Sequence, residues 1–243
     1  MKLGALYGVG VGPGDPELVS VKGVRLIGAC PHLFTPKARV KAESVAFQIA
    51  GRYISVDTQV HELVFPMVKD ESELKEKWDI SARAVANALE KGEDACFITI
   101  GDPFLYSTYI YLVRSLKEIH PEVTIVTVPG ITAYSAVASL TSFPVGEGEE
   151  RVAIIPASYD LGAVRRAISM GGTIILMKVG KNLKNVLALL EEMDVIDDAV
   201  FAGHAGMKNQ RIETDLRKLK DGGDEVGYLS TILVKAANGG ADK

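Results

Sequence analysis

Short apolar runs alternate with longer amphipathic stretches along the first half of the chain. Mostly apolar runs predict buried strands at residues 3–9, 32–35, 62–67, 95–100 and 123–128. Apolar positions at helical spacing between these runs predict helices at residues 17–30, 43–50, 71–91, 106–119 and 131–140. Strands that alternate with helices imply β–α–β crossovers and a mainly parallel sheet. The pattern therefore predicts an α/β fold.

The same alternation continues in the second half, after a segment rich in Gly and Glu at residues 143–150. Strands are expected at residues 152–155, 173–177, 199–203 and 229–234, and helices at 161–170, 183–193 and 215–219. We place a domain boundary in the Gly/Glu-rich segment. The sequence thus predicts an N-terminal α/β domain of residues 1–145 and a C-terminal α/β domain of residues 146–243.

Composition excludes several classes of protein. The chain has 243 residues, of which 47% are hydrophobic, and this apolar content is incompatible with a disordered protein. A formal net charge of −4 without a basic stripe argues against a nucleic-acid partner. The uncharged stretch 123–146 is interrupted by Pro129 and Gly130, which favours a strand, a turn and a helix over a membrane span. Two cysteines make a disulfide scaffold improbable and favour a cytoplasmic protein.

A glycine-rich loop at residues 8–14 lies between the first predicted strand and the first predicted helix. In α/β proteins this position, at the carboxyl end of a strand, is where ligands bind. The loop does not fit the dinucleotide pattern G-x-G-x-x-G, because the third glycine would fall on Pro13 or Asp15. The pattern indicates a rigid loop whose backbone can approach a ligand, and a simple capped turn is the alternative.

Two further loops have the same place in the strand–helix alternation. Gly101–Asp102–Pro103 follows the strand at 95–100, and the segment 129–132 (PGIT) follows the strand at 123–128. An aspartate at such a strand end can pair with a ligand cation, for example an α-ammonium or a sulfonium group. The hydroxyls of Ser107 and Thr108 lie at a helix start, where they can bind a ligand or cap the helix. Because parallel strands end at one edge of a sheet, the three loops predict one pocket.

Taken together, these motifs resemble the tetrapyrrole (corrin/porphyrin) methylases. The resemblance is carried by residues 10–18 (GVGPGDPEL), 101–108 (GDPFLYST) and 129–132 (PGIT), and it extends over nearly the whole chain. Within that family, residues 34–37 (FTPK), 43–46 (ESVA) and 63–67 (LVFPM) are most similar to the branch that methylates C-20 of precorrin-2.

The resemblance implies a homodimer of two αβα domains with a ligand cleft between them, the first sheet mainly parallel and the second mixed. It implies S-adenosyl-L-methionine as methyl donor, S-adenosyl-L-homocysteine as product and a tetrapyrrole as the other substrate. Carried over by motif, the donor site would use Gly101, Asp102, Ser107, Thr108, Ile131, Thr132, Ala133, Met177, Lys178, Ala205, Ser230, Thr231 and Ile232. The loop of Pro13, Gly14 and Asp15 would border the tetrapyrrole.

Methyl transfer from a sulfonium needs mainly the correct placement of the two reactants. This agrees with a sequence that has neither a catalytic triad nor a compact metal motif. A base that takes the proton from the methylated carbon would come from Asp15, Glu17 or Tyr106. His204, between Gly203 and Ala205, is a candidate neighbour of donor or tetrapyrrole, and an ordinary structural histidine is the alternative.

Tetrapyrrole substrates of this family carry many carboxylates, which basic side chains would bind. Lys37, Arg39 and Lys41 lie within one short segment and form the expected carboxylate-binding cluster, with a solvated surface loop as the alternative.

Three matters stay open at the level of sequence. The substrate is either metal-free precorrin-2 or its cobalt form, cobalt-factor II. A rival within the family is methylation of another corrin position or of another family substrate. A rival from a different class is a regulator that binds a nucleoside without catalysis.

Overall fold

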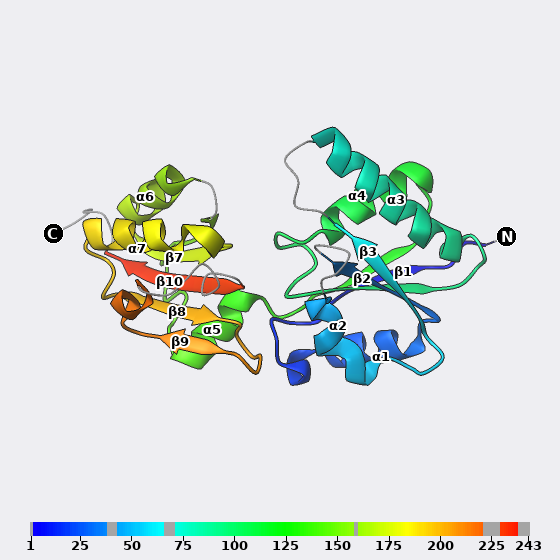
Figure 1. Ribbon diagram of the computed structural model, residues 1–243, viewed down its shortest axis with the longest axis horizontal. Coiled ribbons are helices and arrows are strands. Elements are labelled where there is room, and N and C mark those ends of the chain that lie inside the picture. The colour runs from blue at the N-terminus through cyan, green and yellow to red at the C-terminus, as the bar shows by residue number, and fades with distance from the viewer. Residues whose placement is uncertain (1, 38–42, 66–70, 158–159, 221–228, 238–243) are drawn as a thin grey trace. The chain divides into compact units, whose positions relative to one another are not determined.

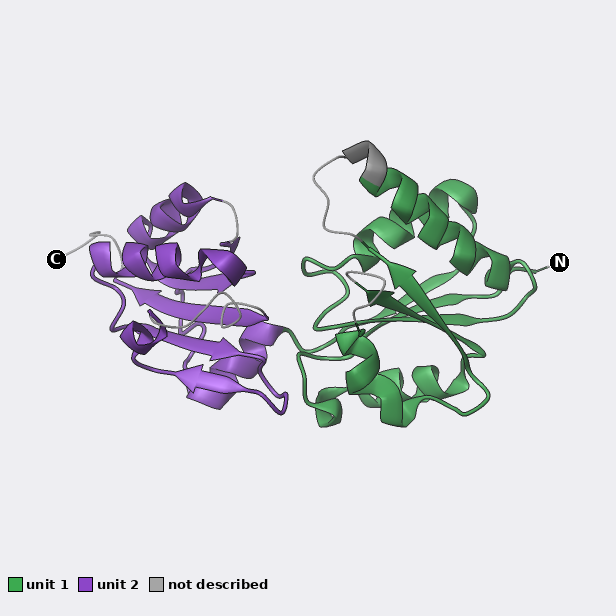
Figure 2. Ribbon diagram, viewed as in Figure 1, with its two compact units in different colours: residues 1–132 green, residues 133–243 purple. Residues whose placement is uncertain are grey.

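The structure is a computed structural model that describes residues 2–37, 43–65, 71–157, 160–220 and 229–237. Figure 2 shows that the chain folds into two compact units, Met1–Thr132 and Ala133–Lys243. Among the described helices, none combines the length and the apolar character needed to cross a bilayer.

The first unit is built on a five-stranded sheet in the order β3-β2-β4-β1-β5. Its strands are β1 (Leu6–Gly10), β2 (His32–Lys37), β3 (Gln59–Val64), β4 (Ala95–Thr99) and β5 (Ile125–Val128). Every neighbouring pair runs parallel, which confirms the expected parallel sheet. The carboxyl ends of all five strands consequently lie along one edge.

Helices cover both faces of this sheet (Figure 1). They are α1 (Val21–Ala29), α2 (Val45–Ala50), α3 (Glu71–Leu89) and α4 (Tyr109–Ile119), with 3₁₀ turns η1 (Pro16–Leu18) and η2 (Gly51–Tyr53). The side of α3 and α4 holds a core in which Phe97, Leu112 and Leu116 are fully buried. Helices on two faces leave every residue of β4 buried, which explains why its first four residues are apolar.

The second unit has a five-stranded sheet in the order β6-β7-β10-β8-β9. Its strands are β6 (Val152–Pro156), β7 (Gly172–Met177), β8 (Ala199–Gly203), β9 (Arg211–Glu213) and β10 (Ser230–Ala236). Only the β6–β7 pair is parallel, so this sheet is mixed, as expected. Helices α6 (Leu161–Ser169) and α7 (Leu183–Glu192) cover one face, and α5 (Ala133–Thr141) covers the other (Figure 1). Two 3₁₀ turns complete the unit, η3 (Gly180–Asn182) and η4 (Leu216–Leu219).

The structure divides the chain before α5, whereas the sequence placed the boundary at residue 145. Helix α5 packs on β10 and β8, where Val137 joins a core with Ile175, Ala202 and Leu233. The Gly/Glu-rich segment is thus a loop inside the second unit. Composition marks a loop, but only tertiary packing decides to which unit the preceding helix belongs.

Three predicted elements differ from the observed ones for local reasons. The helix expected at 17–30 is split, because the Ser20 side chain accepts a hydrogen bond from Gly23 N and starts α1 anew at Val21. The helix expected from residue 106 begins at Tyr109, because Tyr106 has φ of 54°, which an α-helix does not accommodate. The helix expected at 215–219 is the 3₁₀ turn η4, and β9 was not predicted.

Candidate functional site

The three glycine-containing loops meet at the carboxyl edge of the first sheet. Because β1 lies between β4 and β5, the residues that follow these three strands are neighbours. A Cβ on Gly10 would lie 2.5 Å from Gly101 O and 2.6 Å from Gly130 N, and one on Gly130 would lie 2.1 Å from Gly101 O. Only glycine, which has no Cβ, allows the three backbones to approach this closely. The expectation that the three loops share one edge is confirmed.

Backbone hydrogen bonds tie the first loop to the second. Gly101 N donates to Gly12 O at 2.8 Å, and Val11 N donates to Thr99 O at 2.9 Å. Gly12 and Gly101 form an isolated antiparallel bridge and have φ of 76° and 67°. The edge is therefore rigid without help from a ligand.

Open space lies beside Gly101. A Cβ built on this residue would meet no atom within 4 Å, in contrast to the crowded Gly10 and Gly130. A ligand can therefore approach the backbone at Gly101, whose φ of 67° also favours glycine. We call this open space the Gly101 cradle.

The Asp102 side chain bonds to the protein itself. Its Oδ2 accepts a hydrogen bond from Gly130 N at 3.1 Å, and its Oδ1 accepts one from Phe104 N at 2.9 Å. The sequence predicted a carboxylate that pairs with a ligand cation. In the structure each carboxylate oxygen accepts a hydrogen bond from a backbone amide, and pairing with a ligand cation stays a prediction.

Ser107 and Thr108 differ in what their hydroxyls do. Ser107 is buried, its Oγ lies 2.9 Å from Thr99 Oγ1, and it accepts a hydrogen bond from Tyr109 N at 3.2 Å. Thr108 occupies the N-cap position of α4, but its side chain makes no cap hydrogen bond. The Ser107 hydroxyl therefore caps the start of the helix, as one of the two sequence-based alternatives predicted, whereas the Thr108 hydroxyl does not. Thr99, which supports Ser107, was not singled out from the sequence because it reads as an ordinary strand residue.

The candidate bases also differ in their surroundings. Asp15 caps η1, because its Oδ1 accepts a hydrogen bond from Glu17 N at 2.9 Å. Glu17 is exposed in the same turn. Tyr106 is 37% exposed, and burial of the remainder raises the pKa of its phenol. A phenol with a raised pKa stays protonated at neutral pH and is better suited to donate a hydrogen bond than to accept a proton.

The expected carboxylate-binding cluster is described only in part. Lys37 ends β2, and its Nζ lies 2.6 Å from Glu62 Oε2 with the Lys37 side chain 12% exposed. Arg39 and Lys41 lie outside the described residues. Pro13 and Gly14 are buried where the first loop enters η1, at the same sheet edge as Gly101.

In the second unit, the expected donor residues gather at one edge of the sheet. Thr231 pairs with Met177 and Ala202, and Ile232 pairs with Leu176 and Phe201. Ser230 opposes Gly203, and His204 N donates to Leu229 O at 3.0 Å. The ends of β7 and β8 and the start of β10 thus bring Met177, Lys178, Ala205, Ser230, Thr231 and Ile232 together at that edge.

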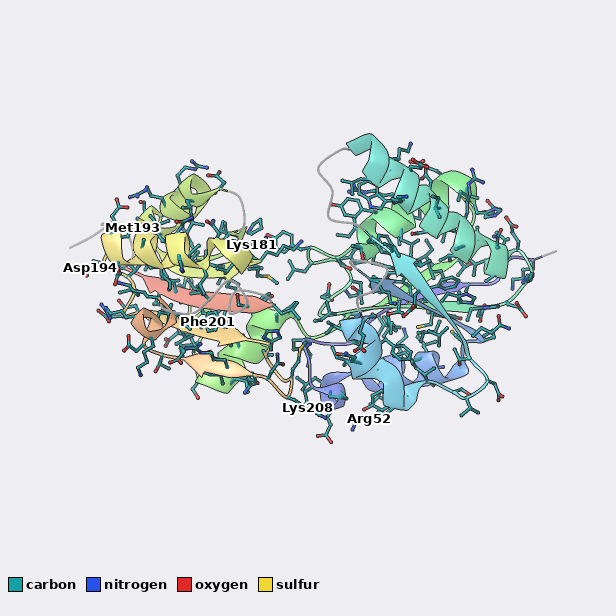
Figure 3. The ribbon with its side chains drawn as sticks, viewed as in Figure 1. Arg52, Lys181, Met193, Asp194, Phe201 and Lys208 are labelled. Atoms are coloured by element: carbon teal, nitrogen blue, oxygen red, sulfur yellow. The ribbon has the colours of Figure 1, made fainter. Side chains whose placement is uncertain are left out.

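Three residues at this edge are strained. Lys178, His204 and Leu229 have φ of 54°, 52° and 48°, a region that residues with a side chain rarely adopt. Burial lowers the pKa of Lys178. Backbone strain of this kind is concentrated at functional sites. No sequence motif predicted it for these three residues. Figure 3 shows Lys181, just after Lys178 in the chain, at one end of α7 and Asp194 at the other.

Ile131, Thr132 and Ala133 continue the chain from the Gly130 loop into α5. Ile131 is 38% exposed, whereas Ala133 is the first residue of α5. This stretch joins the two units, since the division falls between Thr132 and Ala133. Within the described part of the chain, no group of three His, Cys, Asp or Glu side chains could hold a metal ion.

The model of the Tetrapyrrole (Corrin/Porphyrin) Methylases matches residues 5–220 of the chain, a span that includes all three glycine loops and the strained residues Lys178 and His204. The chain belongs to the tetrapyrrole methylases. This membership identifies the two strand edges as parts of a methylase.

Curated relatives of similar length narrow the comparison within the tetrapyrrole methylases. The probable cobalt-precorrin-2 C(20)-methyltransferase of Methanocaldococcus jannaschii is 36% identical over 235 residues, with 95% of each chain covered. The cobalt-precorrin-2 C(20)-methyltransferase of Salmonella typhimurium is 30% identical, with 95% of this chain and 96% of the relative covered. The precorrin-2 C(20)-methyltransferase of a Sinorhizobium species is 31% identical, with 96% and 95% covered.

Solved structures share the fold of this methylase. A cobalt precorrin-4 methyltransferase superposes with a TM-score of 0.73 at 19% identity, with 95% of this chain and 94% of the other covered. Uroporphyrin-III C-methyltransferase from Thermus thermophilus, complexed with S-adenosyl homocysteine, has a TM-score of 0.63 at 19% identity, with 96% and 97% covered.

Proposed function

We propose that this tetrapyrrole methylase transfers a methyl group from S-adenosyl-L-methionine to C-20 of precorrin-2 or of its cobalt form, cobalt-factor II, during corrin ring synthesis for cobalamin. The observation that carries the proposal is the match over 95–96% of the chain to three relatives that are named C(20)-methyltransferases. The edge built by Gly10, Gly101 and Gly130 supports it, because that edge exposes main chain where a donor can lie.

The residues at the two edges are suited to hold a donor. When bound, S-adenosyl-L-methionine supplies a methyl group on a positively charged sulfur, which is already an activated leaving group. In the first unit, Gly101 and Thr108 follow β4, and Ile131 and Thr132 follow β5, two strands whose carboxyl ends lie at one edge of the sheet. In the second unit, Met177, Lys178, Ala205 and Ser230 lie along the edge of the mixed sheet. The donor residues that the family resemblance implies are thus divided between the two units.

Orientation is the main contribution that these residues make to the reaction. A meso carbon of a reduced tetrapyrrole is electron-rich, and alignment with the donor methyl is worth up to about 7–11 kcal/mol of barrier. After transfer, C-20 loses a proton. We propose Asp15 as its acceptor, since the η1 cap uses Oδ1 of this carboxylate and Tyr106 keeps its own proton.

We also propose that the enzyme is a cytoplasmic homodimer. Both cysteines are free thiols, Cys30 and Cys96, as is usual in a reducing compartment. The homodimer follows from the family resemblance. Sedimentation of the purified protein tests it, and a monomer at micromolar concentration would contradict it.

Mass spectrometry after incubation with S-adenosyl-L-methionine tests the reaction. Precorrin-2 is offered once metal-free and once with cobalt inserted, and one of the two is expected to gain a single methyl group. A gain only with cobalt assigns the cobalt-dependent route, and a gain only without metal assigns the other. No gain in either sample contradicts the proposal.

Donor binding separates the two rivals if no methyl is transferred. Titration calorimetry with S-adenosyl-L-homocysteine that shows binding without turnover on any tetrapyrrole would favour the nucleoside-binding regulator. Turnover on another tetrapyrrole would keep the family and change the substrate.

A further inference from the structure

The Asp102 carboxylate joins two loops that the sheet itself leaves unconnected. Asp102 follows β4 and Gly130 follows β5, and these strands are separated by β1. The ladder therefore contains no hydrogen bond between β4 and β5. The bond from Gly130 N to Asp102 Oδ2, at 3.1 Å, crosses over the end of β1.

The contact between these loops is otherwise made by bare backbone. A Cβ on Gly130 would lie 2.1 Å from Gly101 O and 2.7 Å from Gly10 Cα. Glycine backbones can pack this closely, but they have no side chain that would fix how the loops are aligned. The Asp102 side chain supplies a directional contact at this point.

The second carboxylate oxygen fixes the aspartate itself. Oδ1 accepts a hydrogen bond from Phe104 N at 2.9 Å, which closes an Asx turn within the Gly101–Phe104 loop. With one oxygen held by its own loop, the other presents a fixed acceptor to Gly130. Charged acceptors form stronger hydrogen bonds than neutral ones, so the ionised side chain suits this task.

We propose that Asp102 is a positioning residue, whose carboxylate aligns the backbone of residues 130–132 with the Gly101 cradle instead of serving as the counter-ion of the donor. The proposal rests on the proposed function in one respect: residues 130–132 and the Gly101 cradle are taken as part of the donor site. It assigns Asp102 a role through Gly130, whereas the family resemblance implied direct contact with the donor.

Amide hydrogen exchange in the ligand-free protein tests the contact with Gly130. Asp102→Asn replaces one carboxylate oxygen by an NH₂ group, and Asp102→Ala removes both acceptors. In Asp102→Ala the Gly130 amide is expected to exchange at least tenfold faster than in the wild type. In Asp102→Asn the faster exchange is expected at Gly130 or at Phe104, because the NH₂ group of the asparagine side chain faces one of these two backbone amides. Unchanged exchange at Gly130 in both variants would overturn the proposal.

Asp215→Asn is the matched control. Asp215 caps η4 in the second unit by accepting from Arg217 N at 3.2 Å, and it follows the end of β9 that pairs with Phe201, away from the Gly203 end of β8. This variant undergoes the same chemical change at a capping aspartate. It is expected to leave exchange at Gly130 and donor affinity as in the wild type.

Three ligands distinguish positioning from ion pairing. S-adenosyl-L-methionine carries a sulfonium and an α-ammonium group, S-adenosyl-L-homocysteine only the ammonium, and 5′-methylthioadenosine neither. A positioning role predicts that Asp102→Ala, which removes the acceptor for Gly130 N, weakens the binding of all three by a similar factor, about tenfold. A loss of affinity for S-adenosyl-L-methionine alone would identify Asp102 as the counter-ion of the sulfonium group. A loss for both amino-acid ligands that leaves 5′-methylthioadenosine unaffected would identify it as the counter-ion of the ammonium group. Either result overturns the proposal.

Kinetics provide a further readout that general destabilisation would not produce. Asp102→Ala is expected to raise KM for S-adenosyl-L-methionine about tenfold while KM for the tetrapyrrole stays unchanged. An equal rise in both KM values would contradict a role at the donor loops. If the wild-type protein binds none of the three ligands, the proposed function fails, whereas the exchange test of the Gly130 contact still stands.

Discussion

Close packing of glycine backbones builds the edge formed by Gly10, Gly101 and Gly130, and addition of a single methyl group tests this packing. In Gly130→Ala the new Cβ would meet Gly101 O at 2.1 Å, so one of the loops must move. Overpacking of this kind costs about 1–3 kcal/mol of unfolding free energy. We expect urea denaturation to show that loss and calorimetry to show at least tenfold weaker S-adenosyl-L-homocysteine binding.

Gly51→Ala is the matched control for this prediction. Gly51 has φ of −51°, and a Cβ there would meet nothing within 4 Å. Alanine at such a position typically raises the unfolding free energy by about 0.4–1 kcal/mol. Equal behaviour of the two variants would contradict the packing argument.

Asp15 offers a residue-level test of the proton acceptor. Asparagine is as good an N-cap as aspartate, so Asp15→Asn keeps the η1 cap and removes the basic carboxylate. We expect kcat to fall at least a hundredfold, within the range typical of lost general-base catalysis. Donor affinity and melting temperature should stay unchanged. Full activity of this variant would rule out Asp15 as the base.

A histidine pair makes stability depend on pH. His32 Nδ1 lies 3.0 Å from His61 Nε2, and His32 Nε2 lies 2.8 Å from Glu93 Oε2. Burial, His32 and Lys91 lower the pKa of His61 from 6.5, while Phe34 stacks on its ring at 4.6 Å. Because the unfolded chain takes up a proton on His61 before the folded one does, acidification favours unfolding.

We therefore expect the unfolding free energy to fall as the pH drops below about 6.5, the ordinary pKa of histidine. Urea unfolding at a series of pH values measures this slope, and His61→Gln should flatten it. On the other side of His32, its hydrogen bond lowers the pKa of Glu93, whose protonation adds a further loss only at more acidic pH. A wild-type slope that survives in His61→Gln would contradict this assignment.

At the scale of elements, the turns at the ends of β7 and β8 and the turn that leads into β10 retain backbone strain. His204 follows β8 and has φ of 52°. Asp194 has φ of 56° and lies beyond the C-terminal end of α7, where Figure 3 labels it. Left-handed backbone costs a residue with a side chain about 1–2 kcal/mol, and glycine avoids that cost. His204→Gly and Asp194→Gly should therefore both preserve or raise the unfolding free energy.

Activity separates these two glycine variants. We expect His204→Gly to lose at least tenfold in turnover, because His204 lies at the edge that holds Ala205 and Ser230. Asp194→Gly should retain wild-type turnover. If His204→Gly is as active as Asp194→Gly, then His204 is only a structural residue.

The pattern of apolar positions was sufficient to predict most strands, since burial on two faces leaves a plain signal in segments such as β4. It did not predict β9, because residues 211–213 are too few for a period and are all half-buried. The edge of three glycine loops was predictable from parallel topology. The partners of Asp102 were not, because a short polar side chain after a strand can face a ligand or another loop, and only the tertiary structure decides.

At the scale of the whole molecule, two sheets of different construction each present one edge of ligand-binding character. The first is parallel and rigid at glycine contacts, and the second is mixed and strained at Lys178 and His204. The donor residues that the family resemblance implies are divided between these two edges.

The position of the new methyl group tests the account most directly. Precorrin-2 enriched in ¹³C at C-20, metal-free or with cobalt, is incubated with the enzyme and S-adenosyl-L-methionine that carries a ¹³C methyl. The account predicts a product whose methyl signal is split by one-bond coupling to the labelled C-20. A methylated product without this splitting would place the methyl on another carbon and contradict the account.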